Sequence, residues 1–310
     1  MEAAIRLQGL IKQYDDVTAV AGLDLEVRRG ECFGLLGPNG AGKTTTVEIM
    51  EGLTAPTSGL VEVLGLRWDK DGDQLRGRIG VTLQETKLFE KLTVEETLRL
   101  FRTFYDRRRA RDVETVLREL QLSEKRKAWV QKLSGGQRQR LAVALGVMGD
   151  PDILFLDEPT TGLDPQSRRA LWDTISALRA RGKTVVLTTH YMDEAEFLCD
   201  RVAVVDHGKL IALGSPAQLI DDIGGHHLIE LSTDVPLPPQ AVADVAGVRS
   251  VRAAGQGPSL SLSIGEPHVA LPALFTRLAA HGAKPTRLVS RAATLDDVFL
   301  SLTGRTLRED

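Results

Sequence analysis

A glycine-rich segment of eight residues constrains this chain more than any other feature of its sequence. It follows an apolar run, precedes a helical pattern and matches G-x-x-x-x-G-K-[ST] in the context which that pattern requires. Its residues are Gly37, Pro38, Asn39, Gly40, Ala41, Gly42, Lys43 and Thr44. In such a loop, backbone N–H groups converge on phosphate oxygens at the positive end of a helix. The sequence therefore predicts a phosphate-binding loop, and the alternative of a plain strand-to-helix turn is disfavoured by the paired lysine and threonine.

Side chains at this loop and at a second strand end predict a magnesium site. Lys43 can reach the β- and γ-phosphate oxygens, and the Thr44 hydroxyl can ligate Mg²⁺, with Thr45 beside it in the nucleotide-contacting set. Asp157 ends the apolar run ILFLD. An acid at the carboxyl end of a neighbouring parallel strand points to the place where the ion is expected. Thr44 and Asp157 are thus predicted metal ligands.

Glu158 follows directly after the predicted metal ligand Asp157. A carboxylate beside the γ-phosphate can orient or deprotonate an attacking water, which makes Glu158 the candidate general base. An Asp-Glu pair at a strand end is a weak signal alone. Here bulky apolar residues precede the pair and Pro159 follows it, so the loop is held while the carboxylates project.

A second glycine-rich segment stands before the helical pattern RQRLAVALGVM and consists of Ser134, Gly135, Gly136 and Gln137. Its hydroxyl and glycine amides can form another phosphate clamp at a positive helix end. The alternative is a serine N-cap with glycines for close packing. One subunit rarely needs two γ-phosphate clamps on separate helices, so we expect this clamp to serve the nucleotide of a second copy.

Residues 1–222 alternate short apolar runs with helical patterns, which predicts an α/β fold with a mostly parallel sheet. Before the main strands, residues 5–14 and 19–30 alternate as antiparallel strands do. A charged helical insertion is expected over about residues 88–150, where the arginines at 107–109 and 111 form either a basic contact patch or a solvated helix face. The predicted interior strands are 32–37, 153–157, 184–190 and 201–206.

A second domain is expected over residues 226–310, after a short linker at Ile223-Gly224-Gly225. Its pattern reads strand, helix, strand, strand, helix, strand and terminal helix, with the first helix over 238–247. This is the split βαβ order of a small α+β, ferredoxin-like domain. It contains no phosphate loop, paired carboxylates or metal-ligand spacing, so we expect a regulatory or dimerisation domain.

Composition excludes several other classes of protein. The 310 residues include 39 Lys+Arg and 42 Asp+Glu, and this net charge of −3 offers no general field for nucleic acid, which we do not expect as a partner. Cys32 and Cys199 lack disulfide or metal-ligand spacing, which suits a reducing compartment. The start lacks a signal-peptide pattern, and no apolar run approaches the roughly 18 residues of a membrane-spanning helix. A cytoplasmic protein is expected.

The order GPNGAGKT, LSGGQ, ILFLDEP and a strand-end histidine resembles an ABC-type ATPase, the nucleotide-binding subunit of ABC transporters, over roughly residues 4–220. The resemblance implies a P-loop NTPase fold with antiparallel β and helical subdomains, and it implies ATP and Mg²⁺ as ligands. Tyr14 resembles the aromatic that stacks on adenine. Gln84 resembles the hinge glutamine that links Mg²⁺ to the membrane subunit. Asp164 resembles the loop that signals across the dimer, and His190 resembles the switch histidine at the γ-phosphate.

The layout with one cassette and no long coiled coil resembles ABC-2-type exporters. The run TLDDVFL, with Thr303-Gly304, resembles the end of daunorubicin-resistance-like drug and antibiotic ATPases. The resemblance implies an ATP-sandwich homodimer and a separately encoded integral membrane permease. The permease would hold the subunit at the inner face of the cell membrane, and it would export a hydrophobic drug, antibiotic or lipid-like compound. The rival is a non-transport, nucleotide-gated regulatory module, and intact Glu158 and His190 count against it.

Overall fold

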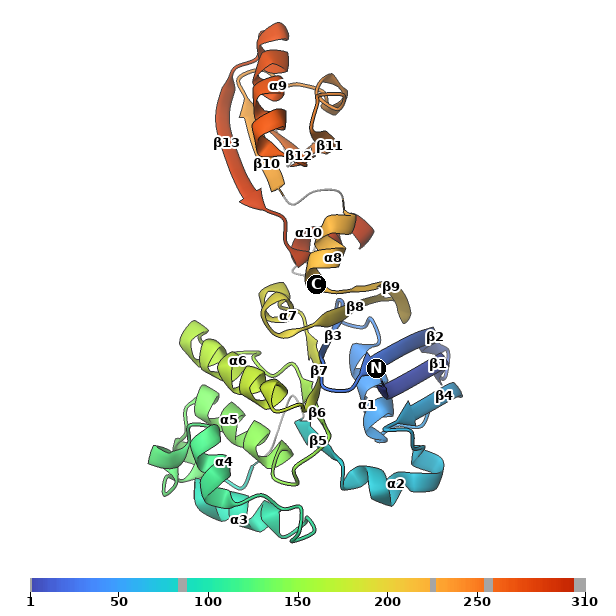
Figure 1. Ribbon diagram of the computed structural model, residues 1–310, viewed down its shortest axis with the longest axis vertical. Helices are drawn as coiled ribbons and strands as arrows, with labels where there is room; N and C mark the ends of the chain where they lie inside the picture. Colours follow the sequence, from blue (N-terminus) through green and yellow to red (C-terminus); the bar gives the residue numbers. More distant parts are fainter. Residues whose placement is uncertain (1, 83–87, 224–226, 254–258, 304–310) are drawn as a thin grey trace. The chain divides into compact units, whose positions relative to one another are not determined.

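The computed structural model describes residues 2–82, 88–223, 227–253 and 259–303, and the chain divides into two units, residues 1–215 and 216–309. The elements of the first unit (Figure 1) are β1 (Ala3–Tyr14), β2 (Val17–Arg28), β3 (Cys32–Leu36), α1 (Lys43–Glu51), β4 (Ser58–Val63), α2 (Trp68–Arg76), β5 (Ile79–Thr82), α3 (Val94–Arg102), α4 (Val113–Glu119), η1 (Ser123–Lys125), η2 (Val130–Lys132), α5 (Gly135–Gly146), β6 (Ile153–Asp157), α6 (Pro165–Ala180), β7 (Thr184–Thr189), α7 (Met192–Leu198), β8 (Arg201–Asp206) and β9 (Lys209–Gly214).

A six-stranded sheet forms the centre of the first unit, in the order β5-β6-β7-β3-β8-β9. β3 pairs in parallel with β7 and β8, whereas the edge strand β9 is antiparallel to β8. All residues of β3, β6 and β7 are buried, as expected for strands that are covered on both faces. The four predicted interior strands are confirmed, and the carboxyl ends of β3, β6 and β7 meet at one edge of the sheet.

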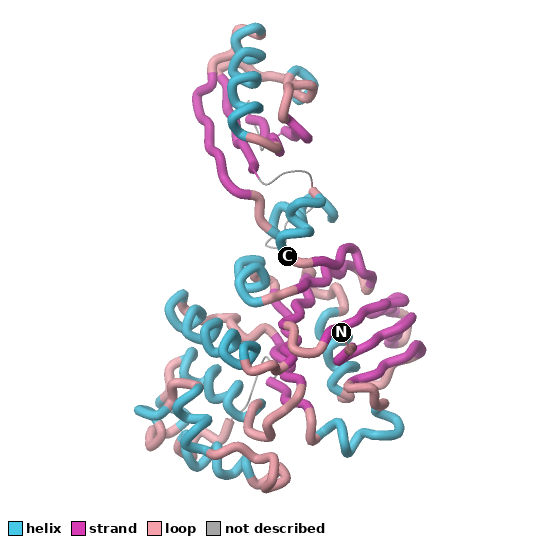
Figure 2. Tube along the Cα trace, in the orientation of Figure 1, coloured by secondary structure: helices cyan, strands magenta, loops and turns pink. Residues whose placement is uncertain are grey.

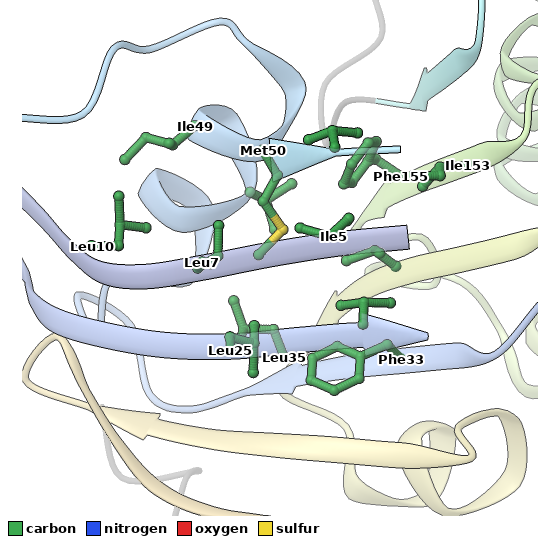
Figure 3. Close-up of a cluster of buried hydrophobic side chains, with 14 of the residues drawn as sticks. Ile5, Leu7, Leu10, Leu25, Phe33, Leu35, Ile49, Met50, Ile153 and Phe155 are labelled. Carbon is green, nitrogen blue, oxygen red and sulfur yellow. The ribbon is translucent and has the colours of Figure 1, made fainter. Parts of the chain in front are cut away.

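A three-stranded antiparallel sheet, in the order β2-β1-β4, closes the main hydrophobic core of this unit. Figure 3 shows Ile5 and Leu7 of β1 gathered with Met50 of α1 and with Phe33 and Phe155 of the central sheet. Each such fully buried side chain stabilises the fold by about 1.5–3 kcal/mol relative to an exposed one. This core fixes α1, and with it the glycine-rich loop that precedes α1, between the two sheets.

Helices α5, α6 and α7 lie across the central sheet from α1 (Figure 1). The described part of the insertion between β5 and β6 is helix and loop (Figure 2). Two arginines of the predicted basic run form ion pairs within the unit, Arg109 with Asp152 at 3.6 Å and Arg111 with Glu119. The run lies between α3 and α4 and not on a helix, so the predicted helical placement of these arginines is wrong. The ion pairs and the exposure of residues 107–109 favour a solvated surface over a basic contact patch.

The second unit is built around a four-stranded sheet in the order β11-β12-β10-β13, with every neighbouring pair antiparallel. Leu274 and Leu278 of its longest described helix pack on Ile229 and Leu262 of the sheet. Its elements are α8 (Pro216–Asp222), β10 (His227–Thr233), η3 (Pro239–Ala241), β11 (Val248–Ala253), β12 (Ser259–Ile264), α9 (Pro267–Ala280), β13 (Pro285–Ala292) and α10 (Leu295–Thr303).

The helix predicted over residues 238–247 is wrong, because the structure has only the 3₁₀ turn η3 there. Two successive prolines start the turn without backbone donors, and Gly247 ends the segment with φ 83°. Val242 and Val245 are nevertheless buried, so the segment supplies apolar side chains to the core without a helix. Gly224 and Gly225 of the predicted linker lie outside the described residues.

Both cysteines are buried and carry free thiols. Burial raises the pKa of the Cys199 thiol, which lowers its reactivity. Within the described residues, no helix combines the length and the apolar character that crossing a membrane requires.

Candidate active site

The glycine-rich loop lies between β3 and α1, and it packs closely against β2. Gly42, the residue before α1, has φ 94°, a conformation that side chains other than glycine rarely adopt. A Cβ atom at this position would lie 2.3 Å from the carbonyl oxygen of Ala19. Glycine is therefore required at residue 42 for the loop to sit against β2. At the tip of the loop, Asn39 and Gly40 are exposed, whereas Gly37, Pro38 and Ala41 are buried.

The Lys43 side chain folds into this loop and is only 5% exposed. Its ammonium donates hydrogen bonds to the carbonyl oxygens of Gly37 at 2.7 Å and Pro38 at 2.9 Å. Burial lowers the pKa of the ammonium, and the carboxylates of Glu158 and Asp157 oppose that fall. Lys43 thus places a positive charge near both strand-end carboxylates, inside the loop predicted to hold phosphate.

The three threonines at the start of α1 have different surroundings. Thr44 is exposed and Thr45 is half-buried. The Thr46 hydroxyl donates to the Gly42 carbonyl oxygen at 2.7 Å and stabilises the first turn of the helix. The Thr44 hydroxyl is therefore accessible to a ligand at the predicted position.

Asp157 ends β6 as a carboxylate that is 8% exposed. Burial raises the pKa of the Asp157 carboxyl, while a hydrogen bond from the Thr188 hydroxyl on β7 and the charge of Lys43 lower it. The same Thr188 hydroxyl accepts a hydrogen bond from the backbone N–H of Glu158 at 3.0 Å. A single side chain on the neighbouring strand thus positions both predicted carboxylate residues.

Glu158 turns the chain away from β6 with φ 44°, a strained value for a residue other than glycine. Its side-chain Oε2 accepts a hydrogen bond from the Thr161 hydroxyl at 3.1 Å and lies 3.4 Å from Nδ1 of His190. The glutamate side chain is 14% exposed and the histidine side chain 33%. The structure therefore brings the candidate base and the strand-end histidine together, from two adjacent strands.

The segment Ser134–Gln137 forms a capping box at the start of α5. The Ser134 hydroxyl accepts from the backbone N–H of Gln137 at 3.3 Å, and the Gln137 side chain accepts from the N–H of Ser134 at 3.1 Å. A Cβ atom on Gly136 would lie 2.6 Å from that of Ser167, so this glycine permits close packing on α6. Within one chain the segment therefore acts as a serine N-cap with a glycine that allows close packing, which was the alternative to a phosphate clamp. Ser134 and Gly135 remain exposed.

The remaining predicted residues are Asp164, Tyr14 and Gln84. Asp164 caps α6 by accepting from the N–H of Ser167 at 2.9 Å, and hydrogen bonds from Ser167 lower the pKa of its carboxyl. Tyr14 lies at the exposed end of β1, with the Lys12 ammonium 4.6 Å from its ring centre. Gln84 lies outside the described residues.

The predicted Mg²⁺ ligands fit the preference of this ion for oxygen donors. Asp157 is a buried carboxylate whose charge is only partly compensated by a hydroxyl and an ammonium, and such a group favours a nearby cation. No group of three or more His, Cys, Asp or Glu side chains within metal-binding reach occurs among the described residues. Mg²⁺ itself takes few protein ligands and shares its coordination with substrate phosphates.

Sequence reasoning missed three side chains at this site. Thr188 and Thr161 hold the carboxylate residues, and the signal for Thr188 was its place two residues before His190 at a strand end. The third is Glu51 at the end of α1, which is 5% exposed and has a buried Oε1 atom without a hydrogen-bond partner. Burial raises the pKa of Glu51 to about 8, with smaller contributions from Asp157 and Glu48. Nothing in the local pattern distinguishes Glu51 from a surface acid.

Comparison with known sequences connects the whole chain to transport proteins. The family model described as ABC transporter matches residues 20–161. The chain is 42% identical over 312 residues to the Nod factor export ATP-binding protein I of Cupriavidus metallidurans, and the alignment covers 100% of both chains.

Solved structures similar to this chain include two ABC transporter subunits. CbiO1 from Clostridium perfringens, part of the transporter complex CbiONQ, is 27% identical with a TM-score of 0.66, covering 72% of this chain and 92% of that chain. The dimeric structure of the bacterial ABC transporter cassette MJ0796 is 28% identical with a TM-score of 0.60, covering 68% of this chain and 98% of that one. The predicted P-loop cassette fold with mixed α/β sheets is thereby confirmed.

Proposed function

The chain belongs to the family of ABC transporter ATP-binding subunits, which hydrolyse ATP, and from this premise we propose that it powers export through a separately encoded membrane permease. The observation that supports the proposal most strongly is the arrangement of Glu158 and His190, whose Oε2 and Nδ1 atoms lie 3.4 Å apart at adjacent strand ends. The Glu158 carboxylate also acts on the buried ammonium of Lys43. A module that only binds nucleotide has no need of a positioned carboxylate there.

We assign the chemistry of hydrolysis to the chain's own side chains as follows. The loop from Gly37 to Thr44 binds the phosphates, and Lys43 neutralises charge that develops on them. Glu158 Oε2 orients the attacking water and accepts its proton, a role that contributes on the order of 10² to 10⁴ in rate. The Thr161 hydroxyl and His190 hold that oxygen in place, and His190 also contacts the γ-phosphate.

Thr44 and Asp157 are the described residues that would hold Mg²⁺, with Gln84 as a third proposed ligand. When bound, Mg²⁺ neutralises charge on the β- and γ-phosphates. We assign adenine stacking to Tyr14, whose exposed ring lies at the end of β1.

A composite site between two copies of this chain explains the position of the second glycine-rich segment. The helix α5, which begins at that segment, and α1, which follows the phosphate loop, lie on opposite faces of the central sheet (Figure 1). We propose that each ATP is held between the Lys43 loop of one copy and the segment Ser134–Gln137 of the other, with Asp164 signalling across the dimer. The dimeric MJ0796 cassette supports this arrangement by similarity.

Export of a hydrophobic drug, antibiotic or lipid-like compound is the transport role that we propose. The relative from Cupriavidus metallidurans bears an export name, and CbiO1 is part of a multi-subunit transporter complex. We place the chain in the ABC-2-type exporter group near the daunorubicin-resistance-like ATPases, bound to its permease at the cytoplasmic face of the cell membrane. The strand order of residues 227–292 supports a ferredoxin-like second domain, with a turn in place of its first helix.

The proposal is tested by capturing the permease and measuring transport. A tagged Glu158→Gln variant, loaded with ATP and Mg²⁺, is expected to retain a polytopic membrane protein from solubilised membranes, and reconstitution of that protein with the parent chain is expected to raise the ATPase rate. Fluorescent hydrophobic compounds should then accumulate in inside-out vesicles with the parent chain and not with the variant. Recovery of soluble homodimers alone, with an ATPase rate that membranes do not change, would reject the transport role.

A further inference from the structure

Two helices of the first unit begin in the segments that follow the proposed catalytic residues. α6 begins directly after Asp164, at the end of the loop that starts with Glu158, and α7 begins two residues after His190. Contacts between these two helices therefore connect the loop that begins at Glu158 to the turn that contains His190.

The exposed part of the contact between α6 and α7 surrounds Arg168. Its guanidinium lies 4.6 Å from the ring centre of Tyr191 and 3.2 Å from the carboxylate of Asp193. The Tyr191 ring in turn lies 4.1 Å from the His190 ring, measured between ring centres. The ion pair is largely exposed on the Asp193 side, so it contributes little to stability on its own.

The buried part of the same contact is centred on Glu194, whose exposed fraction is 0%. The indole N–H of Trp172 on α6 donates to Glu194 Oε1 at 2.9 Å. Burial raises the pKa of the Glu194 carboxyl, and the hydroxyl of Thr189 opposes that rise. Thr189 also accepts the N–H of Tyr191 at 2.9 Å, so it fixes the turn that contains His190.

Two buried atoms beside this contact lack a hydrogen-bond partner of good geometry, Oε2 of Glu194 and the hydroxyl oxygen of Thr160. Thr160 belongs to the loop between Glu158 and Asp164, and it lies close enough to Glu194 to lower the pKa of that carboxyl. A buried polar group without a partner costs free energy, because it has lost its hydrogen bonds to water. A hydrogen bond from the Thr160 hydroxyl to Glu194 Oε2 would satisfy both atoms.

We propose that Glu194 is a positioning residue for ATP hydrolysis, which locks the loop of Glu158 to the turn of His190 when Thr160 donates a hydrogen bond to its free carboxylate oxygen. Trp172 and Thr189 hold Glu194 in place for this contact. The lock keeps Glu158 and His190 at a fixed separation while the loop responds to the second copy. This inference rests on the catalytic roles proposed above for those two residues.

The test compares Thr160→Val with Thr160→Ser, because valine keeps the shape of threonine and serine keeps its hydroxyl. We expect Thr160→Val to lower kcat about three- to tenfold with the KM for ATP within about twofold of the parent, the effect of one lost hydrogen bond in the transition state. Thr160→Ser should recover at least about half of the parent kcat. The matched control is Thr174→Val, a buried threonine on α6 whose hydroxyl bonds only to its own helix, at Ala170; its kcat should equal that of the parent.

A double-mutant cycle tests whether the effect passes through Glu194. If Trp172→Phe and Thr160→Val both act by releasing Glu194, the double variant should lose less kcat than the product of the two single losses. Independent, multiplicative losses would overturn the proposal. So would a Thr160→Val kcat within twofold of the Thr174→Val control, or a loss that disappears when the folded fraction is corrected for.

The same assays include Glu158→Gln, which separates this inference from the proposed function. If Glu158→Gln loses activity while Thr160→Val keeps it, the lock is wrong and the general-base assignment stands. If Glu158→Gln itself keeps the parent rate, the proposed site fails and the lock fails with it.

Discussion

The two units of this protein differ in what they bury. In the first unit, Lys43, Glu51, Asp157 and Glu194 are charged residues that are each at most 8% exposed, whereas the buried polar side chains among the described residues of the second unit are Thr233 and Ser263. Burying a charged group costs free energy unless specific partners compensate for it. Glu31 before β3 is also 8% exposed and pairs with Arg201. Buried ionisable side chains thus distinguish the first unit from the second, although they are not confined to the candidate site.

The ion pairs of the second unit lie at its surface. Arg277 pairs with Asp244 at 2.8 Å and Arg291 with Asp297 at 2.7 Å, and in each pair at least one side chain is more than a third exposed. Such exposed pairs contribute little to stability. The contrast predicts that substitution of the acidic residues at the candidate site affects turnover, whereas substitution of exposed acidic residues in the second unit leaves it unchanged.

The largest effect is expected for Glu158→Gln, which keeps the shape of the side chain and removes its basicity. We expect kcat to fall on the order of 10² to 10⁴ while ATP binding survives, so that an ATP-bound dimer accumulates in size-exclusion chromatography. The control is Glu230→Gln on β10 of the second unit, which should retain the parent rate. If Glu158→Gln hydrolyses ATP at nearly the parent rate, the expected difference in turnover between substitutions in the two units is wrong.

A large effect is also expected from Lys43→Ala and Ser134→Arg, which damage opposite halves of the proposed composite site. Lys43→Ala should weaken ATP binding within one chain, whereas Ser134→Arg should spare that binding and prevent ATP-driven dimerisation. Mixing the two variants equally should restore up to about a quarter of the parent ATPase activity, since half of the dimers are mixed and each mixed dimer contains one intact site. Demonstrated heterodimers without ATPase activity would contradict the shared site.

An intermediate effect on stability is expected for Glu51→Gln. The folded-state pKa of Glu51 is about 8 against an ordinary 4.5, so the folded protein holds a proton that the unfolded chain releases, and stability is lost as pH rises between these values. The variant should lose less free energy of unfolding than the parent between pH 5 and pH 8, by on the order of 1–3 kcal/mol. Urea unfolding at both pH values measures this difference, and parallel curves for the two proteins would show that Glu51 is not buried in its neutral form.

The smallest effect on nucleotide binding is expected from removal of the second unit by a stop after Ser215. The deleted residues hold none of the proposed nucleotide contacts, so the ATP dissociation constant should stay within about twofold of the parent. The dimer population without nucleotide, measured by light scattering, should fall, as should stimulation of ATPase activity by the permease. If neither changes, the second unit only stabilises itself and the regulatory assignment is wrong.

Local sequence patterns were sufficient to predict the phosphate loop, the strand-end acid pair and the buried strands, because each is identified by a few consecutive residues. The loop ending in Lys43-Thr44 and the acid pair after ILFLD carry their signals within eight residues. Apart from Thr188, the central positions of β3, β6, β7 and β8 carry no polar side chain, so these strands were expected to be buried in a sheet. The failed prediction over residues 238–247 shows the limit of such patterns, because Val242 and Val245 are buried there without a helix.

Tertiary structure decided which of these segments meet. Glu158 and His190 lie 3.4 Å apart because β6 pairs with β7, and the sequence pattern of either strand is compatible with other sheet orders. The bridging role of Thr188 and the burial of Glu51 and Glu194 depend on the same packing. Whether an acidic side chain in a helix faces water or the protein interior is set by what the helix packs against, and its own sequence neighbourhood does not contain that information.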